Sequence, residues 1–381
     1  MNFQNFELEY FQSQFERTVE YNLADSSVKC ANVSDLLQGE DARQITDLAL
    51  YYPEVNGTTL LRERIAALYP NASANNILVT VGAAQANWII CESLLEPGDE
   101  VIVISPGYRQ VWGLAKNIGC QVKEVSLRPE RNWQLDLDEL EAAASPKTKL
   151  IAIVNPNNPT GSILSAAEME RVVQICEKSG AWLHADEVYR GTELKQHKET
   201  PGFWGMYDKV VCVNSLSKAY GLAGLRIGWA VASPEIIEEL WRRHEYTVIA
   251  ASGPSMRLAE IALQPQKRSM LLERQQKLSL EGHAILGDWV RSQGDLFSVH
   301  EAIATSIAFV RFHFGMTSVD LANYIRTHAS VLVAPGEYLG TQNYLRITVG
   351  YEPEKVRRAL TAIGKAVASL PQAQRETTSS R

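Results

Sequence analysis

Short runs of apolar, largely β-branched residues recur through the first two thirds of the chain. Segments with helical spacing, such as residues 85–95 and 167–178, lie between most of these runs. Nearly continuous apolar strands that alternate with helices are typical of a mostly parallel sheet covered on both faces. We therefore predict an α/β fold with a seven-stranded sheet, whose strands are Ile77–Val81, Val101–Ile104, Gln121–Val125, Leu150–Val154, Trp182–Ala185, Val210–Val213 and Arg226–Val231.

The last third of the chain predicts a second, smaller unit. Helical patterns cover residues 234–243 and continue, with interruptions, from residue 256 toward residue 290. Short strands and helices then follow one another, which is typical of a small α+β domain. Its predicted strands are Ile307–Phe312, Val331–Val333 and Tyr344–Val349, and its predicted helices are Ser318–His328 and a closing helix from Glu354.

The N-terminus predicts a helical arm. Leu8, Phe11, Phe15 and Val19 fall on one apolar stripe, with glutamates elsewhere around the helix. We expect this arm to consist of residues 1–45. The polar last residues predict a disordered tail over 371–381.

Composition and charge narrow the class of protein. The chain has 381 residues, of which 45% are apolar and 21% charged, as in ordinary folded proteins. It carries 37 basic and 44 acidic residues, a net charge of −7, without a stripe of lysine and arginine. This balance argues against nucleic acid or an anionic membrane as a partner.

The cysteines and the N-terminus predict a cytoplasmic location. The five cysteines, at positions 30, 91, 120, 176 and 212, include no C-x-x-C pair and are typical of free thiols in a reducing compartment. No apolar run approaches the roughly 20 residues of a membrane span. Glu7 and Glu9 precede the first basic residue, Arg17, which is not the pattern of a secretory signal.

The most informative segment covers residues 214–229 and reads NSLSKAYGLAGLRIGW. Lys218 follows a buried strand, where loss of solvation lowers the pKa of an amine and makes it nucleophilic. A surface lysine after a strand is the alternative reading of this motif alone. Ser215 and Lys218 also fit the S-x-x-K of serine acyl-enzymes, but the chain lacks the S-D-N and K-T-G motifs of that chemistry.

Two further strand ends carry polar groups. The segment NPNNPTG, residues 155–161, is a turn by composition, but a turn does not require the amides of both Asn157 and Asn158. Asp186 closes an apolar strand, where its carboxylate needs a partner, either a ligand or a buried cation. We expect His184 to pack beside Asp186 and not to act in catalysis. The seven histidines show no spacing typical of metal ligands, so we predict no metal site.

Together and in this order, these segments resemble the class I/II aminotransferase family of pyridoxal-phosphate (PLP) enzymes, which has fold type I. The resemblance runs over roughly residues 46–370. It implies a large PLP-binding domain with an interdomain helix over residues 46–285 and a small C-terminal domain over 286–370. It also implies that residues 1–45 cover the active site. Pyridoxal 5'-phosphate is the implied cofactor, and an amino acid is the implied substrate.

The resemblance also implies roles for individual residues. Lys218 matches the lysine that forms a Schiff base with the cofactor and then moves protons, and Asp186 matches the acid that keeps the pyridine nitrogen protonated. Tyr189 and Asn158 match the groups that bond to the ring oxygen. The remaining matches are Tyr108 for ring stacking; Gly82, Ala83, Ala84, Ser215, Ser217 and Arg226 for the phosphate; Tyr52 for the phosphate of a neighbouring subunit; and Arg346 for the substrate carboxylate.

One segment departs from the ordinary family pattern. Where ordinary members carry a Gly-x-Pro element near the start, this chain reads NLADSSV, residues 22–28. Together with the arm and the segment RRHEYT, residues 242–247, this resembles the capreomycidine synthase branch of the family, whose members cyclise hydroxylated arginines after eliminating the hydroxyl. Glu9 and Asp25 are then candidate partners for a substrate guanidinium, although each could equally be an ordinary surface or capping carboxylate.

Several functions remain open from the sequence. The favoured one is dehydration and cyclisation of a hydroxylated L-arginine by a homodimer with shared active sites. An amino acid:2-oxo acid aminotransferase and a C–S β-lyase share the fold. A PLP-binding regulatory module is the non-enzymatic alternative, and the absence of a basic helix-turn-helix segment from this sequence disfavours it.

Overall fold

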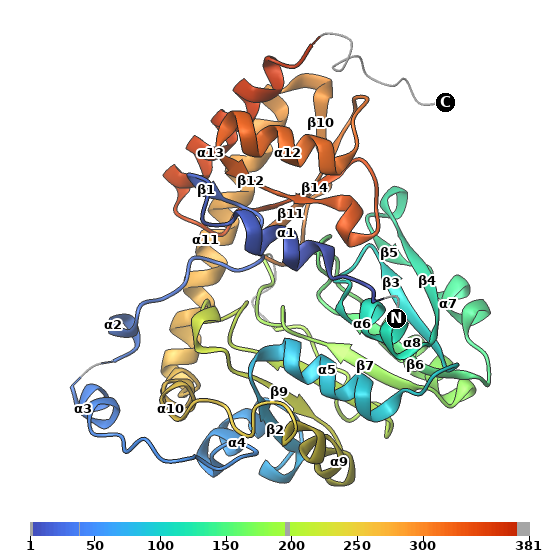
Figure 1. The fold of residues 1–381 in the computed structure, drawn as a ribbon, viewed down its shortest axis with the longest axis vertical. Helices are drawn as coiled ribbons and strands as arrows, with labels where there is room; N and C mark the ends of the chain where they lie inside the picture. The colour runs from blue at the N-terminus through green and yellow to red at the C-terminus, as the bar shows by residue number, and fades with distance from the viewer. Residues whose placement is uncertain (1–2, 38, 195–198, 372–381) are drawn as a thin grey trace.

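A mixed sheet of eight strands forms the centre of the computed structural model, which describes residues 3–37, 39–194 and 199–371. The strand order is β2-β9-β8-β7-β6-β3-β4-β5 (Figure 1). β3, β4, β6, β7 and β8 pair in parallel, whereas β9 is antiparallel to β2 and β8, and β5 is antiparallel to β4. The strands are β2 Ile77–Thr80, β3 Glu100–Ser105, β4 Gln121–Arg128, β5 Gln134–Leu135, β6 Thr148–Val154, β7 Trp182–Asp186, β8 Val210–Ser215 and β9 Gly228–Val231.

Helices bury both faces of this sheet. Successive strand residues point to opposite faces, so Leu78 packs in one apolar cluster with α5, α6 and α9, while its neighbour Ile77 packs in another with α8. The helices of this part of the chain are α4 Thr59–Ala66, α5 Gly82–Leu94, α6 Gln110–Ile118, α7 Leu137–Ala143, α8 Ala166–Ser179, α9 Pro234–His244 and α10 Gly253–Ala262. Short 3-10 helices are η1 Ala74–Asn76, η2 Pro129–Arg131 and η3 Ala223–Leu225.

A second sheet lies above the first in Figure 1 and is antiparallel, with the order β10-β11-β14-β13. The long helix α11 runs from the side of the large sheet to this smaller one. Its Gly282 is explained by packing, because a Cβ atom there would collide with the carbonyl of Val349. The elements of this region are α11 Pro265–Ser292, η4 Gly294–Leu296, β10 Phe297–Val299, β11 Ile307–Phe312, α12 Ser318–Ala329, β12 Val331–Leu332, β13 Ala334–Pro335, η5 Gly336–Leu339, β14 Tyr344–Thr348 and α13 Pro353–Ala368.

The N-terminal arm contacts both regions. Its elements are α1 Glu7–Phe15, β1 Tyr21–Asn22, α2 Val33–Leu36 and α3 Glu40–Thr46. Phe11 packs edge-on against Tyr338 beside the small sheet, and Phe6 packs edge-on against Tyr108 beside the large sheet. β1 also pairs in parallel with β12. The start of the chain therefore lies between the two sheets, where Figure 1 shows α1.

The predicted fold class is confirmed, but several elements differ in detail. The helix of the arm ends at Phe15, before Val19, and the predicted strand over 331–333 is shortened to β12, after which β13 follows in a different sheet. The sheet has an eighth strand, β5, whose two residues are too few to leave a hydrophobic pattern in the sequence. The predicted strand over 226–231 begins only at Gly228, because Arg226 is in the left-handed region with φ 51°. The helical region between residues 256 and 290 was predicted to have several interruptions, but it has one, between α10 and α11.

The domain boundaries stay predictions, and the one at residue 285 falls inside α11. Of the predicted tail, residues 372–381 lie outside the described residues. Within the part of the chain that the structure describes, no helix is long and apolar enough to cross a membrane.

Candidate active site

A pocket of about 280 Å³ lies at the carboxyl ends of the central parallel strands. Parallel strands bring the residues that follow them to one edge of the sheet, which is where open α/β sheets bind ligands. Residues that follow β3, β6, β7 and β8 meet there with the N-terminus of α5 and with the arm. The predicted site residues among its lining are Glu9, Ala83, Ala84, Tyr108, Asn158, Asp186, Tyr189, Ser215, Ser217, Lys218 and Arg226.

Lys218 lies in this pocket just after β8. Its Nζ donates a hydrogen bond to Oγ of Ser26, which belongs to the arm, over 2.7 Å. Burial is the largest influence and lowers the pKa of Lys218. The carboxylate of Asp25 opposes this shift, whereas the guanidinium of Arg346 adds to it. The amine is therefore easier to deprotonate than an exposed lysine, as a nucleophile or a proton acceptor must be.

Asp186 ends β7 and is only 5% exposed. Burial raises its pKa to about 6, and hydrogen bonds from the Val188 N–H and the Asn87 amide oppose that shift. The distances are 3.2 Å from Val188 N to Oδ1 and 3.3 Å from Asn87 Nδ2 to Oδ2. No ion pair to Asp186 occurs among the described residues, and both of its hydrogen-bond donors are neutral, while the nearby charge of Lys218 also opposes the rise of its pKa.

Tyr189 and Asn158 line the pocket from the turns after β7 and β6. The hydroxyl of Tyr189 donates to the backbone carbonyl of Ser26 at 3.4 Å, and burial raises the pKa of this phenol. Oδ1 of Asn158 accepts a hydrogen bond from Nη1 of Arg346 at 3.1 Å. Both groups are therefore fixed by neighbours before any ligand arrives.

Arg346 lies on β14 of the small sheet and does not line the pocket itself. It is 1% exposed, and its Nη2 donates to the carbonyl of Ala24 at 2.6 Å. Its Nε is buried and has no hydrogen-bond partner among the described residues. Through Asn158 and Ala24, this guanidinium connects the small sheet, the turn after β6 and the arm.

The start of α5 fits a phosphate. Gly82 has φ 74°, and a Cβ atom there would collide with the guanidinium of Arg226. Nη1 of Arg226 in turn donates to Oγ of Ser217 at 3.3 Å. The first N–H groups of a helix lack partners within the helix and carry partial positive charge. A guanidinium, hydroxyls and a helix N-terminus therefore converge at this end of the pocket.

The arm closes one side of the pocket. Oε1 of Glu9 accepts a hydrogen bond from the hydroxyl of Tyr108 at 2.9 Å, and both residues line the pocket. Burial raises the pKa of Tyr108 well above its usual value, and the Glu9 carboxylate adds to that shift. The phenol therefore stays a hydrogen-bond donor, and Glu9 brings a negative charge to the pocket.

Besides Gly82 and Arg346, two further predicted residues do not line the pocket. Tyr52 is 83% exposed, on the segment between α3 and α4. Asp25 turns its carboxylate toward other groups: Oδ2 accepts from the hydroxyl of Tyr351 at 2.5 Å, and Oδ1 accepts from the N–H of Ser27 at 2.8 Å. Of the two acidic residues predicted to bind a substrate guanidinium, Glu9 lines the pocket and Asp25 does not.

Sequence reasoning missed six lining residues: the polar Ser26, Asn87 and Gln110, and the apolar Val154, Val188 and Ala223. Asn87 is the most informative of them, because it is 2% exposed and its position on α5 falls among apolar residues. A buried amide on the core side of a helix needs hydrogen-bond partners, and this requirement was a usable signal in the sequence.

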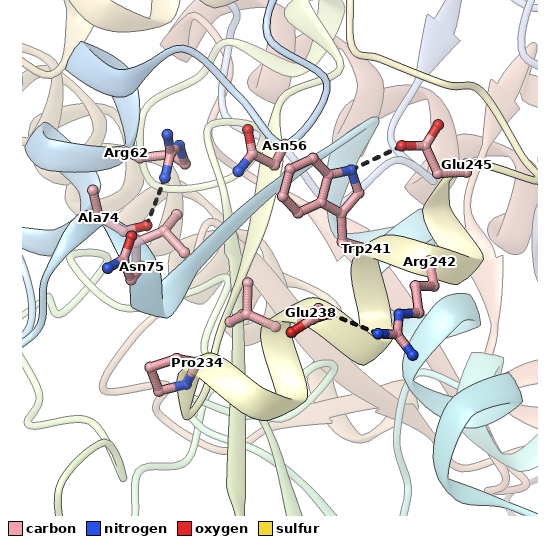
Figure 2. Close-up of a pocket in the computed structure, with 11 residues that line it drawn as sticks. Asn56, Arg62, Ala74, Asn75, Pro234, Glu238, Trp241, Arg242 and Glu245 are labelled. Atoms are coloured by element: carbon pink, nitrogen blue, oxygen red, sulfur yellow. Dashed lines mark hydrogen bonds and ion pairs between the residues drawn. The ribbon is translucent and has the colours of Figure 1, made fainter.

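A second pocket of about 420 Å³ lies beside α9, away from these groups (Figure 2). Its charged and polar side chains bond to one another: Arg242 to Glu238 at 2.6 Å, and Nε1 of Trp241 to Glu245 at 3.0 Å. Arg62 on the opposite wall donates to the carbonyl of Ala74. This pocket holds no buried acid or lysine among its lining, so the candidate active site is the smaller pocket around Lys218.

Comparison with known proteins defines the family. Residues 21–363 match the family described as aminotransferase class I and II, and the chain belongs to this family. A crystal structure of a PLP-dependent aminotransferase from Streptococcus suis superposes with a TM-score of 0.90 and 29% identity, covering 98% of this chain and 100% of that one.

Two of the curated relatives that the chain resembles are the following. Capreomycidine synthase from Streptomyces vinaceus is 28% identical over 84% of this chain and 82% of its own length. An arginine–pyruvate transaminase from Pseudomonas aeruginosa is 33% identical over 50% of each chain.

The protein is therefore an enzyme of this family with pyridoxal 5'-phosphate as its cofactor. The residues of the pocket fit this cofactor. The guanidinium of Arg226 and the N-terminus of α5 can bind its phosphate. The buried carboxylate of Asp186 can bind its ring nitrogen, and the amine of Lys218 can react with its aldehyde. When bound, the cofactor supplies an electron sink for negative charge that develops at the α-carbon of an amino acid. The residues of the chain then have to bind the substrate, hold its α-hydrogen near a base and exclude water.

Proposed function

We propose that this enzyme acts on an L-amino acid with a guanidinium side chain, and that its reaction is dehydration and cyclisation of a hydroxylated L-arginine. The observation that carries the substrate class is the Glu9 carboxylate, which the arm brings into the same pocket as Lys218 and Asp186. A carboxylate can bind a guanidinium through parallel, charge-assisted hydrogen bonds.

The geometry of Glu9 supports this assignment. Its Oε1 accepts from Tyr108, and no hydrogen bond to its Oε2 occurs among the described residues. Tyr108 thereby orients the carboxylate and leaves one oxygen for a ligand. The names of the two curated relatives point the same way, since one is an arginine transaminase and the other a capreomycidine synthase.

The remaining roles follow the predicted pattern. We assign Lys218 to covalent cofactor binding and proton transfer, Asp186 to the ring nitrogen, and Tyr189 with Asn158 to the ring oxygen. Arg346 is assigned to the substrate carboxylate, and its buried, unpartnered Nε supports this role because an arriving carboxylate would satisfy it. The phosphate is assigned to Gly82, Ala83, Ala84, Ser215, Ser217 and Arg226, with Tyr108 stacking on the ring.

Amino transfer to a 2-oxo acid is the second candidate reaction. It would use the same lysine, acid and arginine, and the structural relative from Streptococcus suis is described as an aminotransferase. The two reactions differ in the fate of the amino group, which cyclisation retains and transfer removes.

A homodimer with shared active sites belongs to the proposal. Leu50, Tyr51, Tyr52 and Tyr246 are large apolar or aromatic side chains that are 83–93% exposed. Exposed groups of this size favour a protein interface, and an interface there would let Tyr52 reach the phosphate of the partner subunit. A cytoplasmic location also remains part of the proposal. All five cysteines are free thiols, which fits a reducing compartment.

A substrate panel tests the substrate class. The purified holoenzyme is incubated with L-arginine and hydroxylated L-arginines, and separately with L-aspartate and L-phenylalanine, with and without a 2-oxo acid. The proposal expects both guanidinium amino acids to bind more tightly than the other two by about tenfold or more, the value of one charge-assisted hydrogen bond, and only hydroxylated L-arginine to lose water. Equal or better turnover of the anionic or aromatic substrate contradicts it.

A further inference from the structure

Two buried side chains, Asn87 and His184, and the half-buried Gln110 form a hydrogen-bonded network around Asp186. Asn87 on α5 is at its centre: its Oδ1 lies 2.9 Å from Nε2 of His184, and its Nδ2 donates to Oδ2 of Asp186 at 3.3 Å. The same Nδ2 donates to Oε1 of Gln110 at 3.1 Å. Asn87 and His184 are 2% and 1% exposed, so the contacts of Asn87 with His184 and Asp186 form without competition from bulk water.

The network has only one consistent orientation. Nε2 of Gln110 donates to the carbonyl of Ala84 at 2.8 Å, which turns Oε1 of Gln110 toward Asn87. An oxygen can only accept, so it must face the NH2 of Asn87, and the Asn87 oxygen must then face His184. This assigns the ring proton of His184 to Nε2. Burial lowers the pKa of His184 to about 4, so the ring is neutral near pH 7.

The orientation of the Asn87 amide determines whether a donor or an acceptor faces the Asp186 carboxylate. If the Asn87 amide turned over, its oxygen would face both the Asp186 carboxylate and Oε1 of Gln110, and its NH2 would face the N–H of His184. Two favourable contacts would become repulsive, and His184 could keep the third only by moving its ring proton to Nδ1, which is buried and has no hydrogen-bond partner among the described residues. His184 and Gln110 therefore keep an N–H donor pointed at Oδ2 of Asp186, while the Val188 N–H holds Oδ1.

We propose that Asn87 is a positioning residue, which His184 and Gln110 lock so that it orients the Asp186 carboxylate toward the cofactor ring and stabilises its ionised form. The network starts at the carbonyl of Ala84, in the turn assigned to the phosphate, and ends at the acid assigned to the ring nitrogen. One chain of amides thus sets the spacing between the two ends of the cofactor site. The inference rests on the proposed role of Asp186 and is independent of the substrate.

The test compares Asn87→Leu with Asn76→Leu in the full-length protein. Asn76 is a matched control, since it is also buried and donates from Nδ2 to a protein oxygen, the Ala232 carbonyl at 3.0 Å, but lies outside the pocket. Three quantities are measured: the melting temperature of the cofactor-free protein, the Kd of PLP for that protein, and the pH midpoint of the visible absorption change of the holoenzyme.

We expect both variants to melt at lower temperature, but only Asn87→Leu to weaken PLP binding, by about tenfold, and to shift the spectral midpoint by about half a pH unit or more. Gln110→Ala removes the hydrogen bond between Gln110 and Asn87 and leaves the core intact. It should change the PLP affinity and the spectral midpoint in the same direction as Asn87→Leu, but by less. It also serves as the test if Asn87→Leu does not fold.

Wild-type PLP affinity and spectral midpoint in both Asn87→Leu and Gln110→Ala would overturn the inference and leave Asn87 with packing alone. Asp186→Asn separates this outcome from failure of the site assignment. If it too leaves the PLP affinity and the spectrum unchanged, the proposed role of Asp186 is wrong; if it changes them while the other two variants do not, only the role of Asn87 is wrong.

Discussion

Nζ of Lys218 lies 2.7 Å from Oγ of Ser26, two residues that are 192 positions apart in the sequence. Ser26 belongs to the N-terminal arm, and its backbone carbonyl also accepts a hydrogen bond from Tyr189. The arm therefore contributes to the position of the amine as well as covering the pocket. This contact connects the least ordinary part of the sequence, NLADSSV, to the residue that carries the chemistry.

Removing the Ser26 hydroxyl should slow the reaction without releasing the cofactor. We expect Ser26→Ala to lower kcat by about 2- to 12-fold, the value of one neutral hydrogen bond, because the amine loses a group that orients it. The neighbouring buried Ser27 provides the control, and Ser27→Ala should retain wild-type kcat. Steady-state kinetics and the PLP content of each variant are the measurements. Equal rates for both variants and the wild type would contradict the positioning role of Ser26.

Lys218 should be the residue that holds the cofactor covalently. Borohydride treatment of the holoenzyme, followed by digestion and mass spectrometry, should place the reduced cofactor on the peptide that contains Lys218. Lys218→Ala should lose this label and all turnover, while the phosphate cup around Arg226 still binds PLP. Labelling of another lysine would show that the assignment of Lys218 is wrong.

Tyr52 should act across a dimer interface, since it is 83% exposed in its own chain and does not line the pocket there. Tyr52→Phe should weaken PLP binding by about tenfold, the value of one hydrogen bond to a charged group. Mixing Tyr52→Phe chains with Lys218→Ala chains should form hybrid dimers with one intact site. The intact site should recover PLP affinity and activity above either parent. Hybrids that form but recover nothing would argue against a shared site.

Glu9 should select for a positive substrate side chain. We expect Glu9→Gln to lower kcat/KM for a guanidinium substrate by about tenfold or more, because one partner of a charge-assisted bond is lost. The visible spectrum of the bound cofactor should not change. Glu7 lies in the same first turn of α1 but does not line the pocket, so Glu7→Gln is the matched control and should behave as the wild type. The same loss in both variants would point to a general effect of charge on the arm.

The sequence predicted those site residues that lie at the ends of strands. Lys218 and Asp186 each follow a run of buried apolar residues, and a charged group in that position requires a partner or a function. Parallel strands bring their ends together, so both groups line one pocket, whereas their predicted roles came from the resemblance to the family.

The missed residues depend on contacts between segments far apart in the chain. Asn87 bonds to His184 across 97 positions, and no local pattern specifies that pair. Asp25 and Glu9 looked equivalent as acidic residues of the arm, and only the fold separates them, because Tyr351 on a distant segment binds the carboxylate of Asp25. Strand β5 was missed for a different reason, since two residues are too short a run to show alternation.

Cyclisation of a hydroxylated arginine and amino transfer differ in whether turnover requires a 2-oxo acid. The purified holoenzyme is incubated with hydroxylated L-arginine in the complete absence of any 2-oxo acid, and the products are followed by mass spectrometry. We expect many turnovers to a product one water lighter than the substrate, with the α-amino group retained and the visible spectrum of the enzyme restored after the substrate is consumed. If the enzyme instead stops after a single turnover, releases a keto acid and resumes only when 2-oxoglutarate or pyruvate is added, it is an aminotransferase and the cyclisation account is wrong.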